Sequence, residues 1–157
     1  MRINLICIGK TDDKEIKNLI QYYIPRLPKH WNFDLIEIPD VKNAKNMSPD
    51  NIKKEEAKLF LNHIESSDWN IILDEKGKQY TSREFAGKLD NHMNSSVKKV
   101  NFLVGGAYGF SEEIYAKANE KIALSKMTFT HQMVRLFIVE QIYRAHQILS
   151  GKPYHND

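Results

Sequence analysis

The segment 130–150 constrains the fold more than any other part of the chain. Its spacing is helical, and its apolar side chains fall on nearly every face of such a helix: Met133, Val134, Leu136, Phe137, Ile138, Val139, Ile142, Tyr143, Ile148 and Leu149. A helix that is apolar all round is buried on several sides. One side can face a sheet of the same chain, and we expect the other to face a second copy. The segment therefore predicts a homodimer.

The tail after this segment carries side chains that do chemistry. Tyr154 and His155 follow Pro153, which stiffens the approach, on a stretch too short to fold alone. End residues ordinarily fray. A phenol and an imidazole just past a buried helix instead favour an active site assembled at the dimer interface.

Length and residue usage narrow the class of protein. A chain of 157 residues fits one domain spanning residues 1–157. The single cysteine, Cys7, excludes an internal disulfide and a cysteine-based zinc site. It lies in an apolar run, which predicts a buried thiol. The six histidines show no metal-ligand spacing, so we expect no metal site.

Charge and hydropathy argue against a membrane protein and leave RNA binding open. The net charge of +3 is a mild excess that permits nucleic-acid binding without arguing for it. Any RNA contact would use local lysines, such as Lys42 and Lys45 or Lys98 and Lys99. No apolar stretch has the length of a transmembrane helix, and the chain opens directly into a strand-like run without a signal-peptide cleavage site. We expect a cytoplasmic protein without a membrane partner.

Strand-like and helix-like segments alternate along the chain. Strands are predicted at residues 3–8, 33–38, 69–74, 100–104 and 122–124. Helices are predicted at residues 12–27, from Ser48 to about Ser66, from a capping box at Thr81, at 112–119, and at 130–150. This order predicts an α/β fold with a mainly parallel sheet of five to six strands and helices on both faces.

Three predicted strand ends late in the chain are candidates for a ligand site. They are residues 73–77, the glycine cluster at 105–109, and residues 124–128. Ligands of open α/β sheets bind beyond the carboxyl ends of the strands. No dinucleotide or Walker A glycine motif follows the first strand, where only Gly9 and Lys10 stand. The ligand is therefore expected at the C-terminal half of the sheet.

Three charged side chains of the long helix also have ordinary structural explanations. Arg144 lies four residues after Glu140, so a surface ion pair accounts for it as readily as catalysis does. Arg135 has no such partner and is expected to reach solvent. For His131, a capping or core role is favoured over a functional one.

Five segments together resemble a known family. They are Leu73-Asp-Glu-Lys-Gly77, Phe102-Leu-Val-Gly-Gly-Ala-Tyr-Gly-Phe110, Met127-Thr-Phe-Thr-His-Gln132 after Leu124-Ser125, Glu140-Gln-Ile-Tyr-Arg-Ala145 and Pro153-Tyr-His155. They resemble the RlmH family, the pseudouridine N3-methyltransferases of 23S ribosomal RNA within the SPOUT, or α/β-knot, class. The resemblance covers essentially the whole chain and is densest after Val100.

The resemblance implies a SPOUT-type fold with a C-terminal trefoil knot, a homodimer, and S-adenosylmethionine as methyl donor. Knots are otherwise nearly absent from proteins, so pattern alone would not have proposed one. The implied acceptor is N3 of a pseudouridine in helix 69 of 23S ribosomal RNA, on assembled ribosomes. The cofactor contacts it implies are Leu73, Gly105, Leu124, Ser125, Lys126 (through its backbone only), Met127, Thr128 and Phe129.

The resemblance also places Arg144, Tyr154 and His155 on the methyl-acceptor side. Arg144 could stabilise negative charge on the uracil carbonyl oxygens. Tyr154 or His155 could orient the base or accept the N3 proton, and no metal is required. Family members commonly carry a basic residue after the Tyr-His pair, whereas Asn156 and Asp157 stand here. A phosphate contact at that position is therefore not carried over.

Two other functions stay open at this point. One is a knotted methyltransferase that acts on another RNA, such as tRNA. The other is a non-catalytic nucleotide-binding α/β module of flavodoxin-like type, which would bind a flavin or nucleotide instead of S-adenosylmethionine.

Overall fold

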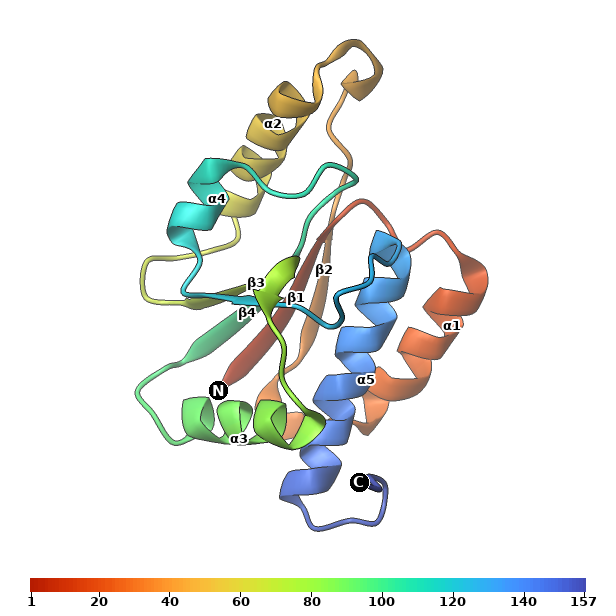
Figure 1. The fold of residues 1–157 in the computed structure, drawn as a ribbon, viewed down its shortest axis with the longest axis vertical. Coiled ribbons are helices and arrows are strands. Elements are labelled where there is room, and N and C mark those ends of the chain that lie inside the picture. The colour runs from red at the N-terminus through yellow and green to blue at the C-terminus, as the bar shows by residue number, and fades with distance from the viewer.

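A five-stranded parallel sheet lies at the centre of the computed structural model, which describes residues 1–157 (Figure 1). The strands are β1 (Arg2–Ile8), β2 (Asp34–Ile38), β3 (Trp69–Lys78), β4 (Lys99–Val104) and β5 (Glu120–Ile122). Their order is β2-β1-β4-β3-β5, and every neighbouring pair is parallel. The predicted α/β fold with a parallel sheet is confirmed. The trefoil knot stays a prediction.

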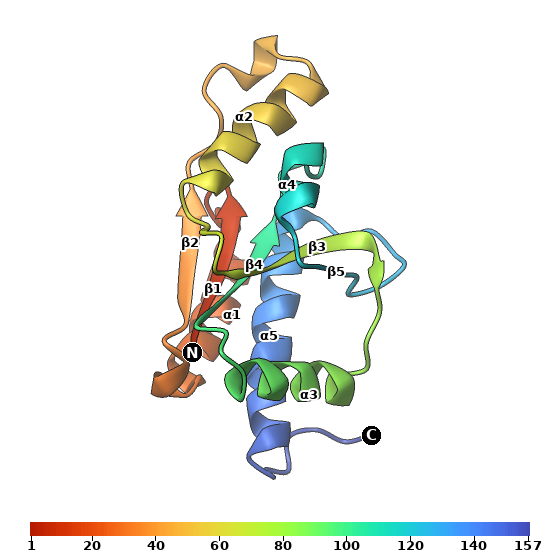
Figure 2. The same ribbon diagram turned by 90° about the vertical axis from the view of Figure 1, so that its left-hand side faces the viewer.

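Five α-helices cover the two faces of the sheet. They are α1 (Lys14–Tyr23), α2 (Pro49–Leu61), α3 (Ser82–Met93), α4 (Glu112–Lys117) and α5 (His131–Leu149). One hydrophobic core joins α1, α3 and α5 to the strands, and a second joins α2 and α4 to the opposite face. Figures 1 and 2 show the two groups of helices on either side of the strands. None of the helices is both long and apolar enough to span a membrane.

Capping side chains fix where the helices begin. The C-terminal ends of two helices differ from the predicted ends. The side chains of Ser48, Thr81 and Thr130 accept the N–H groups expected of N-caps, and Thr81 forms the predicted capping box with Glu84. Helix α1 stops at Tyr23 and α2 at Leu61, earlier than predicted. Pro25 explains the first difference, because it lies in the 3-10 turn Ile24–Arg26 that ends α1.

Two strand boundaries depend on pairing that no local pattern reveals. Strand β3 continues past Asp74 to Lys78, where it still pairs with Ile122 after an irregularity in the register. Strand β5 begins at Glu120, two residues before the predicted start.

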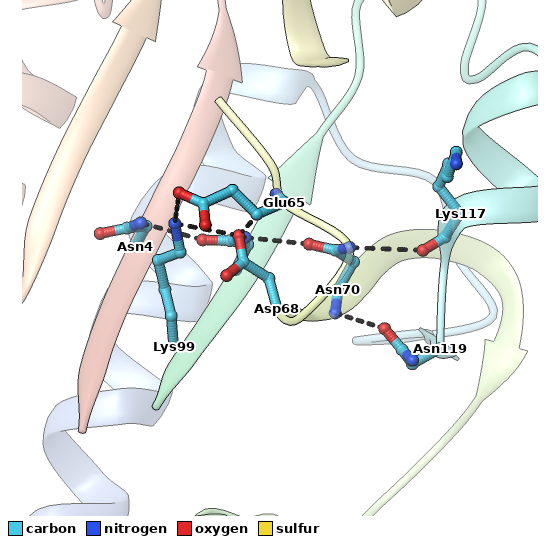
Figure 3. Close-up of polar contacts among 8 residues, drawn as sticks. Asn4, Glu65, Asp68, Asn70, Lys99, Lys117 and Asn119 are labelled. Atoms are coloured by element: carbon cyan, nitrogen blue, oxygen red, sulfur yellow. Dashed lines mark hydrogen bonds and ion pairs between the residues drawn. The ribbon is translucent and has the colours of Figure 1, made fainter. Parts of the chain in front are cut away.

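A line of buried asparagines joins the three central strands (Figure 3). Asn4, Asn101 and Asn70 stand at matching register positions on β1, β4 and β3. The Asn4 amide donates to Asn101 over 2.9 Å, and the Asn101 amide donates to Asn70 over 2.9 Å and to Asp68 over 3.0 Å. Lys99 pairs with Asp68 at 3.0 Å. Because a slip of one residue would leave these amides unpaired, the line specifies the register of the sheet.

The surroundings of α5 differ from those expected. Besides the sheet, α1 and α3 of the same chain pack against it, and all three neighbours share one core. They bury Ile138, Val139 and Ile142 completely. A second copy of the chain is therefore needed only for side chains that stay accessible, such as Leu149, which is 39% exposed.

Arg135 is fully buried, and the expectation that it reaches solvent is wrong. Its guanidinium donates to the carbonyls of Ile8 at 2.6 Å and Gly9 at 2.9 Å, and to the hydroxyl of Thr11 at 3.0 Å. These carbonyls lie where β1 ends, so few strand partners remain for them. Glu37 lies 3.7 Å from the guanidinium and offsets its charge. Cys7 is also fully buried, as predicted, and burial raises its pKa to about 12.

Candidate active site

A cavity of about 600 Å³ opens at the carboxyl ends of β3, β4 and β5. Its walls come from the three late segments singled out in the sequence, from Tyr115 of α4, and from the first turn of α5 through His131 and Val134. The lining includes Leu73, Gly105, Leu124, Ser125, Met127, Thr128 and Phe129. This size is usual for a site that encloses a small organic ligand.

Lys126 does not line the cavity. Its neighbours Ser125 and Met127 do, and the hydroxyl of Ser125 accepts the N–H of Met127 over 3.0 Å. That bond makes a short turn around Lys126, whose side chain stays outside the cavity.

The glycine segment after β4 forms a tight turn along one wall. The N–H of Gly109 donates to the carbonyl of Gly106 over 3.2 Å, and Gly109 has a φ of 79°. A Cβ on Gly105 would come within 3.1 Å of the Gly109 carbonyl oxygen and 3.3 Å of the Phe110 ring. A side chain at Gly105 would therefore press on the turn as well as occupy the cavity.

Acidic groups of the second half of β3 lie in the cavity wall. Asp74 and Glu75 both line it, and the Tyr115 hydroxyl donates to Asp74. Burial, and then this hydrogen bond, raise the pKa of Tyr115, so the phenol stays neutral. The sequence analysis placed Asp74 in a candidate ligand segment, residues 73–77, but named neither Asp74 nor Tyr115 as a site residue. The position of Asp74 at a strand end was a usable signal, whereas nothing local marked Tyr115.

The tail is folded back on its own chain rather than frayed. The Tyr154 hydroxyl donates to Glu140 over 3.0 Å, and its ring packs on Tyr143 with centroids 5.0 Å apart. The Arg144 guanidinium donates to Glu140 over 2.6 Å and lies 4.8 Å from the Tyr154 ring centroid. Gln141 donates to the second oxygen of Glu140 over 3.0 Å. The predicted pair of Glu140 and Arg144 thus forms, with Glu140 joining Arg144 to Tyr154.

The contacts of His155 fix where its proton lies. Its Nδ1 is 3.2 Å from Nη1 of Arg144, and its Nε2 is 3.0 Å from Oδ1 of Asp157. A guanidinium can only donate, so Nδ1 accepts and Nε2 carries the hydrogen that faces the carboxylate. Asp157 is held in turn by Arg83 of α3, with Nε 2.7 Å from Oδ1 and Nη2 2.6 Å from Oδ2. Asp157 therefore takes part in side-chain contacts within the protein.

Within one chain, the tail and the cavity lie at opposite ends of α5. His131 at the start of the helix lines the cavity, and Arg144 follows it about 20 Å further along the axis at ~1.5 Å per residue. Both views show α5 running away from the carboxyl ends of the strands toward the C-terminus (Figures 1 and 2). The structure brings Arg144, Tyr154 and His155 together, and brings the cavity residues together. It does not join the two groups in one chain.

The rim of the cavity carries apolar side chains open to solvent. Met127 is 74% exposed, Tyr108 is 54% exposed and Phe129 is 36% exposed. A smaller apolar cavity of about 290 Å³ lies next to it between α3 and α5 and shares Ile122, Leu124 and Phe129 with it. Several accessible apolar groups around one mouth are typical of a surface that binds something.

Known proteins match this chain along essentially its full length. The model of a family described as predicted SPOUT methyltransferase matches residues 1–155. Proteins named Ribosomal RNA large subunit methyltransferase H from Christiangramia forsetii and Flavobacterium johnsoniae are 49% and 51% identical over 156 residues, which is 99% of this chain and of each relative. A protein of the same name from Parabacteroides distasonis is 48% identical over 157 residues, covering both chains completely.

Proposed function

Because the chain belongs to the SPOUT methyltransferase family, we propose that it is an S-adenosylmethionine-dependent methyltransferase of large-subunit ribosomal RNA. The proposed acceptor is N3 of a pseudouridine in helix 69 of 23S ribosomal RNA, on assembled ribosomes in the cytoplasm. One catalytic domain of residues 1–157 would carry the reaction. The observation that supports this most is a family match over residues 1–155 whose cavity forms at the strand ends the sequence singled out.

The lining of the cavity supports S-adenosylmethionine as its ligand. When bound, this molecule supplies a methyl group on a positively charged sulfonium, and its amino-acid end carries an ammonium. Asp74 and Glu75 outnumber the one lysine in the wall, Lys76, which suits a ligand with a net positive charge. Leu73, Val104 and Leu124 offer apolar surface for a flat base. The backbone of residues 124–129 and the turn at 105–109 would supply the remaining polar contacts.

The methyl acceptor would meet Arg144, Tyr154 and His155. Methyl transfer to a ring nitrogen needs alignment more than covalent help. N3 of uracil attacks more readily once its proton has left, and the negative charge then spreads to the flanking carbonyl oxygens. Arg144 would stabilise that charge. Glu140 would act through its contacts, because it holds both Arg144 and Tyr154.

The hydrogen bonds of the tail favour Tyr154 over His155 as the group that takes the N3 proton. Both ring nitrogens of His155 are occupied, Nδ1 by Arg144 and Nε2 by Asp157. Besides its contact with Tyr23, the Tyr154 oxygen can accept one further hydrogen bond while its own proton points at Glu140. As the N3 proton reaches Tyr154, the hydroxyl proton can pass to the Glu140 carboxylate, so no phenolate accumulates. The raised pKa of Tyr154, caused first by burial, agrees with a phenol that stays neutral.

A homodimer would bring the two halves of the site together. In one chain the tail lies about 20 Å along α5 from the cavity. The cavity rim is apolar and open, and Leu149 near the end of α5 is also exposed. A second copy in the opposite orientation would set its tail over this rim. We propose that each tail completes the cavity of the partner.

A methylation assay tests the proposed function directly. Ribosomes, free large subunits, free 23S RNA and tRNA are each incubated with the protein and S-adenosylmethionine that carries a labelled methyl group. We expect label in helix 69 of assembled ribosomes, at N3 of pseudouridine by mass spectrometry. Label in tRNA alone would contradict the acceptor. Binding of a flavin or nucleotide, but not of S-adenosylmethionine, would contradict the enzyme class.

A further inference from the structure

Helix α2 buries an acid that the proposed reaction does not use. Glu56 is 7% exposed, and no lysine, arginine or histidine lies within ion-pair distance of it. It does not line the cavity. Burying a carboxylate without a cation costs free energy, so the contacts of Glu56 need an explanation.

The contact of Glu56 is with the glycine turn that forms the cavity wall. The backbone N–H of Gly106 is near enough to its carboxylate to lower the pKa of Glu56. The carboxylate lies so close that a Cβ on Gly106 would stand 2.4 Å from Oε1. Only glycine can occupy this position while Glu56 keeps its place. The turn is thus held between the cavity on one side and Glu56 on the other.

The same face of α2 makes a second contact with this turn. Phe60, one helical turn after Glu56, packs on Phe110, with ring centroids 5.8 Å apart. Phe110 in turn packs on Tyr115, whose hydroxyl donates to Asp74 in the cavity. Helix α2 therefore contacts both ends of the segment 106–110 and borders the site without entering it.

We propose that Glu56 is a positioning residue of the cofactor site, which keeps the turn of residues 105–109 in shape for S-adenosylmethionine by holding its carboxylate against the Gly106 backbone. The inference rests on the proposed function, because it assigns that ligand to the cavity. Without this carboxylate, Gly106 would have space to move on that side, and the turn would lose its fixed edge.

The charge of Glu56 adds a measurable signature. The pKa of Glu56 is raised to about 7, mainly by burial. The nearby Asp40 also raises this pKa, whereas the Gly106 N–H lowers it. Asp40 follows β2 and is the charged group that faces Glu56. A carboxylate accepts an N–H about twice as strongly as a neutral group does. The hold on Gly106 therefore weakens as the pH falls through about 7.

The test compares S-adenosylmethionine affinity by calorimetry between pH 5.5 and 8.5 in the full-length protein and in Glu56→Gln. Glutamine has the same size and can still pack against Gly106, but it carries no charge. At pH 8.5 we expect Glu56→Gln to bind roughly fivefold more weakly than the unmodified protein. At pH 5.5 the two affinities should converge. The ratio of the two cancels any titration of the ligand itself.

The matched control is Glu55→Gln, on the same helix. The Glu55 side chain is 42% exposed and pairs with Lys58 at 2.7 Å, away from the turn. We expect its affinity to follow that of the unmodified protein at every pH. Thermal unfolding of each variant checks that the fold is intact.

Three results would overturn the proposal, in distinguishable ways. If the unmodified protein binds no S-adenosylmethionine at any pH, the proposed function fails and the assignment of Glu56 fails with it. If it binds, but the ratio to Glu56→Gln stays at one across the pH range, Glu56 does not position the site. A constant ratio above one would mean that the carboxylate charge is not what holds the turn.

Discussion

Arg144 combines an ordinary contact with a proposed catalytic role. Its pair with Glu140 is the one expected of residues four apart on a helix, and such pairs contribute about 0.2–0.5 kcal/mol. The same guanidinium lies over the Tyr154 ring and contacts His155, so it also orders the tail. Removing it separates these roles, because a surface pair affects stability and an acceptor-side group affects turnover.

We predict that Arg144→Ala keeps S-adenosylmethionine affinity and the fold but loses methylation of ribosomes. Arg144→Lys is the matched variant, since lysine keeps the charge but lacks the planar fork of donors. It should restore only part of the activity. The measurements are single-turnover methylation and calorimetry of the cofactor. Normal turnover in Arg144→Ala would leave Arg144 with a structural role only.

Arg135 is the buried counterpart of Arg144 on the same helix. We predict that Arg135→Met lowers the free energy of unfolding by roughly 3–5 kcal/mol, because the carbonyls of Ile8 and Gly9 and the nearby Glu37 would lose their donor. The exposed Arg26→Met should change it by less than about 1 kcal/mol. Urea unfolding of both variants measures the difference. Equal costs would show that burial of Arg135 contributes little.

Single residues also mark where sequence patterns stop being informative. Cys7 was placed correctly because an apolar run predicts burial. Arg135 was misplaced because its partners, Ile8 and Gly9, are more than a hundred positions away and are backbone atoms, which leave no trace in residue types. Glu56 was missed for a similar reason, since its neighbour is the backbone of a glycine.

At the scale of elements, the helix and strand order could be predicted, but the neighbours of each element could not. Local periodicity and caps gave every strand and α-helix. The extension of β3 to Lys78 and the position of β5 depend on pairing between the two strands. The cover of α5 by α1 and α3 depends on strand order, because that order decides which crossover helices share a face.

The buried asparagine line is an element-scale device for register. We predict that Asn101→Ala lowers the free energy of unfolding by roughly 2–4 kcal/mol, since Asn4, Asn70 and Asp68 each lose a buried partner. Asn18→Ala on the exposed side of α1 is the control and should change little. Denaturant titration measures both. A small effect at Asn101 would mean that strand packing alone sets the register.

Helix α2 adds a pH dependence of stability. The pKa of Glu56 is about 7 in the folded protein and lies near 4.5 in the unfolded chain. Between these values the folded state holds a proton that the unfolded state releases, so stability falls as the pH rises. We predict that Glu56→Gln removes this loss and is more stable at pH 8 by on the order of 2 kcal/mol. Equal pH profiles of unfolding for both proteins would contradict it.

At the scale of the whole molecule, we propose that the cavity and the tail act as two half-sites. The candidate cofactor residues could be predicted from strand ends and resemblance, and all but Lys126 line one cavity. The tail residues could be named from the sequence, but not their distance from that cavity. Only the length of α5 and the fold of the tail reveal that separation. We therefore propose that two chains together make one site.

Mixed dimers test whether two chains together make one site. One chain lacks residues 152–157, and the other carries Gly105→Val, which crowds the turn and the cavity. Different affinity tags allow the mixed dimer to be purified. Each homodimer should be inactive, while the mixed dimer should recover one working site, because an intact cavity meets an intact tail. Ribosome methylation per dimer is the measurement.

The decisive control puts both changes in one chain and pairs it with an unmodified chain. If the tail acts on the partner, this dimer has no complete site and is inactive, whereas the dimer with one change in each chain is active. If the tail acts within its own chain, the activities are reversed. We predict activity only when the two changes lie on different chains. Activity only when they share a chain would contradict the shared-site account.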